Sequence, residues 1–190
     1  MRRTLWCLLI PALTAAQPPK LGERAPQFPG ESPGRQTLLL VERDSCKPHS
    51  ADALKEAAER LAALRTSLVV AEDAPHYGSG CGAYLIDGGG VLRRAGQAGP
   101  EARDLVEFVE LWRTGKVNFE LACARCHGTD GNLDDYPRIK KLGGIGNRLS
   151  KEQMLERVFP VELSRDEISV RSHLFTRREL NALFVYISGL

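Results

Sequence analysis

The sequence predicts two small domains, an α/β unit followed by an all-α unit. Residues 17–113 contain short apolar runs and helical patterns in the order strand, helix, strand, hairpin, helix, which is typical of an α/β unit. Thr114-Gly115 marks a break, and residues 114–190 then carry helical patterns on either side of a glycine-rich loop. A length of 190 residues allows one ordinary domain or two small ones, and the break favours two.

The composition narrows the classes of protein before any motif is considered. With 43% hydrophobic and 26% charged residues, the chain is neither a disordered tail, nor a collagen-like fibre, nor a multi-pass membrane protein. The formal net charge is only +2, from 26 basic and 24 acidic residues. A dedicated nucleic-acid-binding protein would usually carry a clustered excess of Lys and Arg, so no nucleic-acid partner is expected.

Residues 1–16 have the pattern of a secretory signal peptide. Two arginines precede a short apolar run at 5–13, and small residues follow before Gln17, as at a signal cleavage site. The run is about half as long as a membrane-spanning helix, so we expect cleavage rather than a retained anchor. The mature protein would be exported, to the periplasm or outside the cell, without membrane association. Cleavage removes Cys7 and leaves four cysteines in a compartment that permits disulfides: Cys46, Cys81, Cys123 and Cys126.

The elements of the first unit follow from their periodicity. Apolar runs at 37–41 and 67–70 predict two buried strands. Ser50 begins an amphipathic helix between them, because the apolar residues that follow it repeat at the spacing of one helical face. Three glycines between the apolar segments 83–87 and 91–95 predict a hairpin.

Helices and a long loop account for the rest of the chain. A helix is expected at 100–112, with Trp112 on its apolar face, and another at 117–126 beyond the break. Residues 128–149 are rich in glycine and are expected to form a loop. Two capping boxes begin the last two helices: Ser150 with Gln153, and Thr176 with Glu179.

The most specific feature is Cys123-Ala124-Arg125-Cys126-His127, the C-x-x-C-H pattern of c-type haem attachment. Two thiols three residues apart can add to the two vinyl groups of one haem, and the adjacent His127 can ligate the iron. A zinc site is the first alternative, but it needs four ligands and no second Cys or His pair follows. A redox disulfide is the second alternative. A thioredoxin-type C-x-x-C opens a helix, whereas this one ends a helical segment.

The residues around this motif resemble the class I cytochrome c family. The resemblance covers about residues 114–190. It implies an all-α fold that holds one covalent haem c and carries out one-electron transfer. The positions that carry it are Gly115 with Phe119, the segment CARCHGTDG, Tyr136-Pro137, the capped helix at Ser150 and the ending RRELNALFVYISGL.

Two contacts are implied by this resemblance. The helix that carries Phe119 would cross the C-terminal helix, with Phe119 against Leu183 or Tyr186. The carbonyl of Pro137 would accept the imidazole N–H of His127, a bond that fixes the tautomer and tunes the iron. A plain turn is the alternative role for the proline.

The sequence departs from the family at the second axial ligand. Family members usually supply a Met in the loop before the last helix, and residues 159–175 contain none. Met154 is interpreted as a core residue instead. His173 lies in the right loop and is the candidate distal iron ligand. The alternative is a surface histidine beside an iron whose sixth position is open or holds water, and His/His ligation would lower the reduction potential relative to His/Met.

Segments of residues 21–113 resemble a shortened thioredoxin-like (redoxin) domain. The segments are LGERAPQF, TLLLVERDSCKPH and CGAYLIDGGGVLRR. The resemblance maps the first redox cysteine to Cys46, the second to His49 and the cis-proline position to Cys81. Conventional dithiol exchange needs both cysteines of the redox motif, and this sequence lacks one.

Three alternatives follow for these residues. A structural disulfide between Cys46 and Cys81 is the first. In the second, Cys46 is an active thiol whose pKa is lowered by a helix N-terminus, by Lys47 and by His49, so that Cys46 and His49 are candidate catalytic residues. In the third, both cysteines are inert buried thiols, or His49 joins a metal site. His76 lies in a polar loop and is interpreted as a surface residue.

These observations predict an exported electron-transfer protein rather than a catalyst. A cytochrome c domain would carry one-electron transfer, and the thioredoxin-like domain would dock or position redox protein partners. No small-molecule substrate is identified. Two other functions remain open: a thiol-linked haem oxidoreductase that uses Cys46, and a haem-based ligand sensor with a vacant sixth position.

Overall fold

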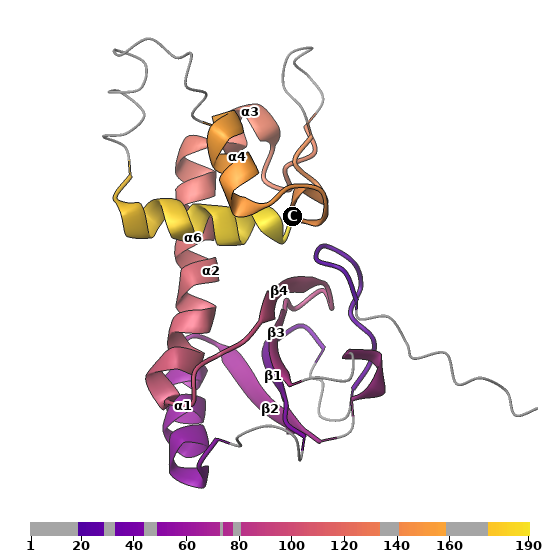
Figure 1. Cartoon of the computed structure of the whole chain (residues 1–190), viewed down its shortest axis with the longest axis vertical. Helices are drawn as coiled ribbons and strands as arrows, with labels where there is room; N and C mark the ends of the chain where they lie inside the picture. The colour runs from indigo at the N-terminus through magenta and orange to yellow at the C-terminus, as the bar shows by residue number, and fades with distance from the viewer. Residues whose placement is uncertain are drawn as a thin grey trace, which may run out of the picture.

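Four strands form a mixed sheet at one end of the molecule (Figure 1). In the computed structural model their order across the sheet is β2-β1-β3-β4. Strand β1 (Gln36–Val41) pairs in parallel with β2 (Thr66–Ala71), whereas β3 (Gly82–Ile86) runs antiparallel to both β1 and β4 (Leu92–Gly96). The structure describes residues 19–28, 33–43, 49–72, 74–77, 81–133, 141–158 and 175–190.

Helix α1 (Ala51–Ala63) connects the two parallel strands. The hydroxyl of Ser50 accepts a hydrogen bond from the backbone N–H of Ala53 at 3.1 Å, so the helix begins at the predicted residue. Ala57 and Leu61 lie one turn apart on its buried face. A parallel pair needs a crossover of this length, because a tight turn joins only antiparallel strands.

Side chains of the sheet alternate between two cores. Leu38 and Leu40 lie in a core that includes buried residues of α1 and of the helices that follow. Leu39 and Val41 lie in a second core with Tyr77, from the short 3-10 helix Pro75–Tyr77. This alternation is the two-residue period of a strand that is covered on both faces.

Helix α2 (Ala102–Ala122) is 21 residues long and passes without interruption through Thr114-Gly115, where the sequence predicts a break. Gly115 serves close packing here. A Cβ at this position would lie 1.9 Å from the carbonyl oxygen of Ala182 in helix α6 (Arg177–Ser188). Figure 1 shows α6 crossing α2. No helix among the described residues is both long and apolar enough to cross a membrane.

The prediction of an α/β domain followed by a separate all-α cytochrome c domain is wrong. The structure is a single α/β body, and α2 belongs to both of the predicted halves. Helix α6 also contacts the sheet, because Arg93 in β4 donates a hydrogen bond from its Nη1 atom to the carbonyl of Gly189 at 3.0 Å. Buried residues of the sheet, of α2 and of α6 belong to one core cluster. A local sequence pattern contains no information on such contacts between distant segments.

The predicted elements themselves are largely present. The order strand, helix, strand, hairpin, helix is confirmed. Beyond α2, the described chain continues with α3 (Ala124–His127), the 3-10 helix Ile145–Asn147, α4 (Lys151–Val158) and α6. Both capping boxes are present, with reciprocal hydrogen bonds of 2.8 and 3.3 Å in the first and of 2.7 and 3.3 Å in the second. The predicted contact between Phe119 and Tyr186 is confirmed, with ring centroids 5.3 Å apart.

Candidate functional site

Helix α2 ends directly at the C-x-x-C-H motif. The carbonyl of Cys123 accepts hydrogen bonds from the backbone N–H groups of Cys126 and His127, at 3.1 and 3.0 Å, and these bonds close the single turn of α3. Gly128 ends that turn with a φ of 75°, a left-handed conformation that glycine adopts without steric cost. The two cysteines and the histidine are therefore held on one turn of backbone at the end of a long helix.

The two cysteines of the motif are free thiols in different surroundings. Cys126 is exposed, whereas Cys123 is half-buried. Burial raises the pKa of the Cys123 thiol, and the nearby Cys126 raises it further. Because the thiolate is the nucleophile, Cys123 is the less reactive of the two near neutral pH.

His127 is half-buried, and its Nδ1 atom is shielded from solvent. No described residue offers that atom a hydrogen-bond partner. The carbonyl of His127 accepts the N–H of Leu133 at 2.9 Å, so its backbone is fixed on both sides. In histidines that ligate a metal, the second ring nitrogen usually donates to another group. The acceptor predicted for it, the carbonyl of Pro137, lies outside the described residues.

Apolar side chains pack beside the motif. Cys123 contacts the core cluster that contains Phe119 and Met154, and Ile145 packs partly buried against the same cluster. Met154 is 4% exposed, so its interpretation as a core residue is confirmed. The candidate distal ligand His173 lies outside the described residues. Residues 1–16, the predicted signal peptide, lie outside them as well.

The two alternatives for the C-x-x-C-H motif gain no support from the described part of the chain. No three His, Cys, Asp or Glu side chains gather there in a group that could hold a metal ion, whereas a structural zinc site needs four ligands. The two cysteines are unbonded, and they lie at the end of the long helix α2 and on the single turn of α3 rather than at the start of a long helix. Two reduced thiols and a histidine on one turn fit the donor set for haem attachment.

Cys81, the residue before β3, is disulfide-bonded. Its backbone carbonyl accepts a hydrogen bond from Nε2 of Gln97 at 2.8 Å, which ties it to the end of the hairpin. Cys46 lies outside the described residues, so the pairing of Cys46 with Cys81 stays a prediction. The free state of Cys123 and Cys126 shows that the bond of Cys81 does not involve the C-x-x-C-H motif.

His49 uses both ring nitrogens inside the molecule. Nδ1 lies 2.5 Å from Oε1 of Glu42, and Nε2 lies 3.0 Å from the carbonyl oxygen of Gly99. A carbonyl can only accept, so Nε2 carries a proton and donates it. His49 thus connects the end of β1 to the loop before α2, and its side chain is 12% exposed. For His49 to activate Cys46, one of these two contacts would have to break. His76 is exposed, as predicted.

One residue and one groove were not predicted from the sequence. The residue is Glu42, the partner of His49, and the sequence indicates it only by its position directly after an apolar strand. The groove lies beside the middle of α2, where Arg65 and Lys116 lie among several basic side chains. The groove draws its residues from three separated segments, so no local pattern could reveal it.

Comparisons with known proteins add no relative to this picture. No family model matches the chain, and no curated protein or solved structure matches it either.

Proposed function

We propose that the chain is an exported electron-transfer protein that binds one haem c covalently. The single observation that carries this proposal is the turn at the end of α2, where two free thiols lie beside a histidine whose buried Nδ1 has no partner among the described residues. Thioether attachment needs reduced cysteines, and axial ligation needs an imidazole whose other nitrogen is oriented. The resemblance of residues 114–190 to class I cytochromes c supports the same proposal.

Each residue of the turn has a defined role in this proposal. Cys123 and Cys126 would hold the haem, each Sγ bonded to one carbon of a vinyl group whose other carbon takes the S–H hydrogen. His127 would ligate the iron. When bound, the haem supplies a centre that gains and loses one electron. His173 is the candidate for the sixth ligand, and an iron without a protein ligand there would favour the sensor alternative.

The α/β end of the molecule would position redox protein partners. Helix α2 connects it to the motif without a loop, so a partner bound at the sheet would be held at a fixed place relative to His127. The disulfide of Cys81 supports a structural role for that cysteine. A thiol-linked oxidoreductase that uses Cys46 would need this disulfide to be absent, or to be formed with another cysteine.

The direct test is expression of the full chain in a bacterium that attaches haem to exported proteins. We expect haem that stays with the denatured polypeptide, a mature N-terminus at Gln17, and a reversible one-electron spectral change. Cys123→Ala with Cys126→Ala should abolish covalent haem. His127→Ala removes the proposed iron ligand. His76→Ala is its control, because His76 is exposed and lies outside the motif. Wild-type protein that is exported without haem would refute the proposal.

The sixth ligand needs a separate measurement. His173→Ala or His173→Met should change the Soret and near-infrared spectra of the haem protein, with His76→Ala again unchanged. An unchanged spectrum in both His173 variants would exclude this histidine as a ligand. Carbon monoxide binding to the reduced wild type, without displacement of a strong ligand, would then support the sensor alternative.

A further inference from the structure

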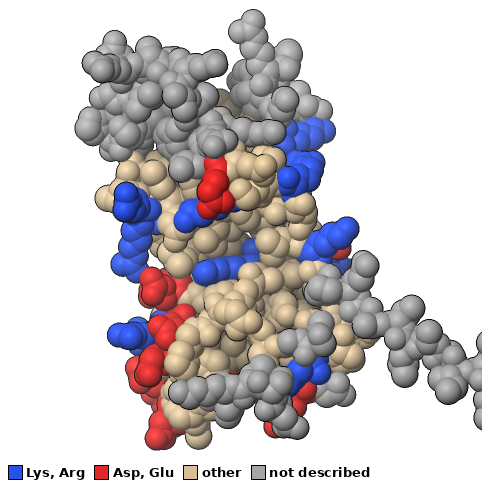
Figure 2. All heavy atoms as spheres, viewed as in Figure 1, with Lys and Arg blue, Asp and Glu red and all other residues tan. Residues whose placement is uncertain are grey.

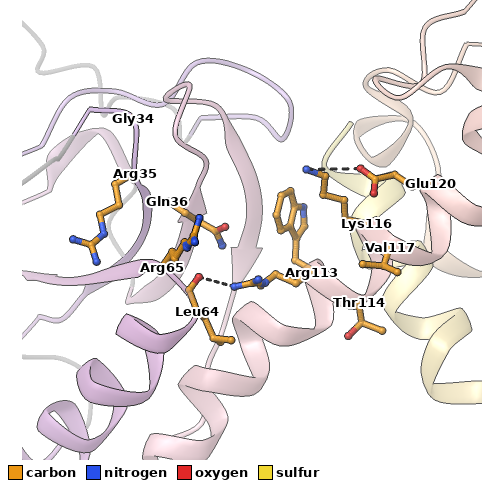
Figure 3. A pocket seen from close by; sticks show the side chains of 11 residues that line it. Gly34, Arg35, Gln36, Leu64, Arg65, Arg113, Thr114, Lys116, Val117 and Glu120 are labelled. Atoms are coloured by element: carbon orange, nitrogen blue, oxygen red, sulfur yellow. Dashed lines mark hydrogen bonds and ion pairs between the residues drawn. The ribbon is translucent and has the colours of Figure 1, made fainter.

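A groove of about 810 Å³ lies between the sheet end of the molecule and the middle of α2. Figure 3 shows its two walls. The start of β1 with Gln36 and the turn before β2 with Arg65 form one wall, and α2 forms the other with Arg113, Lys116 and Glu120. None of the residues of the C-x-x-C-H motif lines it. Its volume is within the range of about 300–1,000 Å³ that is usual for small-molecule sites.

Two N–H donors on residues that line this groove are shielded from solvent and have no acceptor among the described residues. Trp112 is 7% exposed, and its Nε1 atom has no hydrogen-bond partner among the described residues. The Nε2 atom of Gln36 is shielded in the same way and also lacks a partner there. Buried polar groups in proteins are nearly always paired, so both donors would gain an acceptor if a small movement of the lining turned them toward a ligand in the groove.

The charges of the groove favour an anion. Arg35, Arg65, Arg113 and Lys116 line it together with a single carboxylate, Glu120. Lys116 lies 3.8 Å from that carboxylate, and Arg113 donates to the carbonyl of Leu64 (Figure 3). Arg35 and Arg65 form no ion pair within the described parts of the chain.

Acidic side chains lie mostly elsewhere. In Figure 2 they gather at the lower left, over α1 and the first turns of α2. Those of α2 include Glu101, Asp104 and Glu107, which precede the groove residues of that helix by at least one turn. The positive charges of the groove are therefore balanced mainly by solvent ions or by a bound ligand.

The groove also has an apolar part. The side chain of Leu64 lines it, as does Val117, which is 53% exposed although it lies on a helix with a large buried face. The indole ring of Trp112, which also lines the groove, packs against the ring of Tyr186, with centroids 5.4 Å apart. An inorganic ion alone would leave these apolar groups uncovered.

We propose that this groove binds a small organic anion, an oxygen-rich carboxylate or phosphate ester with an apolar portion. Arg65 and Lys116 neutralise its charge, because guanidinium and ammonium groups form charge-assisted hydrogen bonds with such oxygens. A small movement of the lining would also offer the N–H groups of Trp112 and Gln36 to these oxygens. The apolar portion covers Leu64 and Val117. This site is independent of haem attachment, since it uses none of the residues of that motif.

The test uses the indole N–H of Trp112 as a reporter. Of the two tryptophans, Trp6 lies in the predicted signal peptide, so ¹⁵N labelling of tryptophan gives one indole signal in the mature protein, and its loss in Trp112→Phe assigns it. Benzylmalonate represents the carboxylate source and phenyl phosphate the phosphate ester, each with an apolar ring and each titrated at constant ionic strength. We expect the Trp112 signal to shift in a saturable way with at least one probe, and the stronger of the two identifies the source.

Charge variants distinguish a specific binding site from nonspecific electrostatic attraction. Arg65→Gln and Lys116→Gln should each weaken binding of the better probe by about tenfold, which corresponds to one charge-assisted hydrogen bond. Arg103→Gln is the matched control, because Arg103 lies on the same helix, is 77% exposed and does not line the groove. The control should bind like the wild type.

Three outcomes would overturn the proposal. The first is a Trp112 signal that does not move with either probe at millimolar concentration. The second is an equal loss of affinity in Arg103→Gln, which would mean that only general charge attraction acts. The third is binding of an acidic peptide, such as a glutamate decamer, without binding of either small probe, which would assign the groove to a protein partner.

Discussion

The sheet end and the motif end of the molecule are built differently, although α2 runs through both. Around the sheet, side chains of β1, β3, α1 and α2 fill two cores, and Leu38, Leu39, Leu61 and Leu85 are all fully buried. At the motif, neither α3 nor the 3-10 helix Ile145–Asn147 has a buried residue. The sheet end is therefore stabilised by its own side chains. These two short helices of the motif end have no buried side chain of their own, and the proposed haem would supply the surface against which they pack.

The largest expected effect is at the crossing that joins these two ends. In Gly115→Val the new side chain would meet the backbone of Ala182 and the Cβ of Tyr186, at 1.9 and 2.7 Å from the first added carbon. Backbone cannot rotate away as a side chain can, so we expect a loss of about 4 kcal/mol in the free energy of unfolding, above the usual cost of overpacking. Urea denaturation measures it.

A glycine that has room for a Cβ is the control for that substitution. A Cβ at Gly96 would have only an ordinary contact, 3.8 Å from Phe108, so Gly96→Ala should change stability little. If Gly115→Val is tolerated equally well, α2 and α6 do not cross at the distance that places a Cβ of residue 115 at 1.9 Å from the carbonyl oxygen of Ala182. The two ends would then be connected by α2 alone.

Core truncations compare the two ends directly. Leu38→Ala should cost about 3 kcal/mol, because Leu38 is fully buried among side chains of the chain itself. The cost should be the same in the haem-loaded protein and in the variant with Cys123→Ala and Cys126→Ala. For Met154→Ala, near the motif, we expect a smaller cost in the variant without attached haem. Equal costs for Met154→Ala in both backgrounds would show that the motif end is packed without the cofactor.

The local part of the fold was predictable because its signals are local. Ser50 and Thr176 are caps whose partners lie three residues away, and the strands follow from runs of apolar residues. The division into two domains was wrong for a related reason. In a sequence, a glycine that ends a helix looks the same as a glycine that lets a second helix pack closely. Gly115 lets α6 pack closely against α2.

The same distinction holds for the candidate sites. Cys123, Cys126 and His127 form one turn, so their spacing alone brings them together. The groove joins Gln36, Arg65 and the middle of α2, which become neighbours only when β1 pairs with β2 and α2 packs beside them. A signal spread over three segments cannot be recognised in a single sequence.

A smaller effect is expected at the start of α6. Thr176→Ala removes the hydroxyl that accepts the N–H of Glu179 and should cost about 1 kcal/mol. Glu179 accepts the N–H of Thr176 in return, which holds the pKa of its carboxyl below the ordinary 4.5. A lowered pKa in the folded state stabilises the protein above the ordinary value, and this contribution is lost as the pH falls through the lowered one. The stability difference between wild type and Glu179→Gln should therefore shrink in acid.

Thermal unfolding from neutral to acid pH measures this difference. Thr114→Ala is the control, because Thr114 is an exposed threonine within α2 and caps no helix. A constant difference between wild type and Glu179→Gln across the pH range would mean that the capping box does not form in solution.

The smallest predicted effect is a difference in reaction rate between the two cysteines of the motif. It involves no change in the stability of the protein. In the protein before haem attachment, iodoacetamide should modify the exposed Cys126 faster than the half-buried Cys123, whose thiol has a raised pKa. Raising the pH should narrow the gap, because it converts the Cys123 thiol to thiolate. Cys81, being disulfide-bonded, should not react until a reductant is added, and mass spectrometry of the peptides reads all three sites. Equal rates at Cys123 and Cys126 near neutral pH would mean that Cys123 is not shielded, and the motif end would then be more open than the packing around Phe119 indicates.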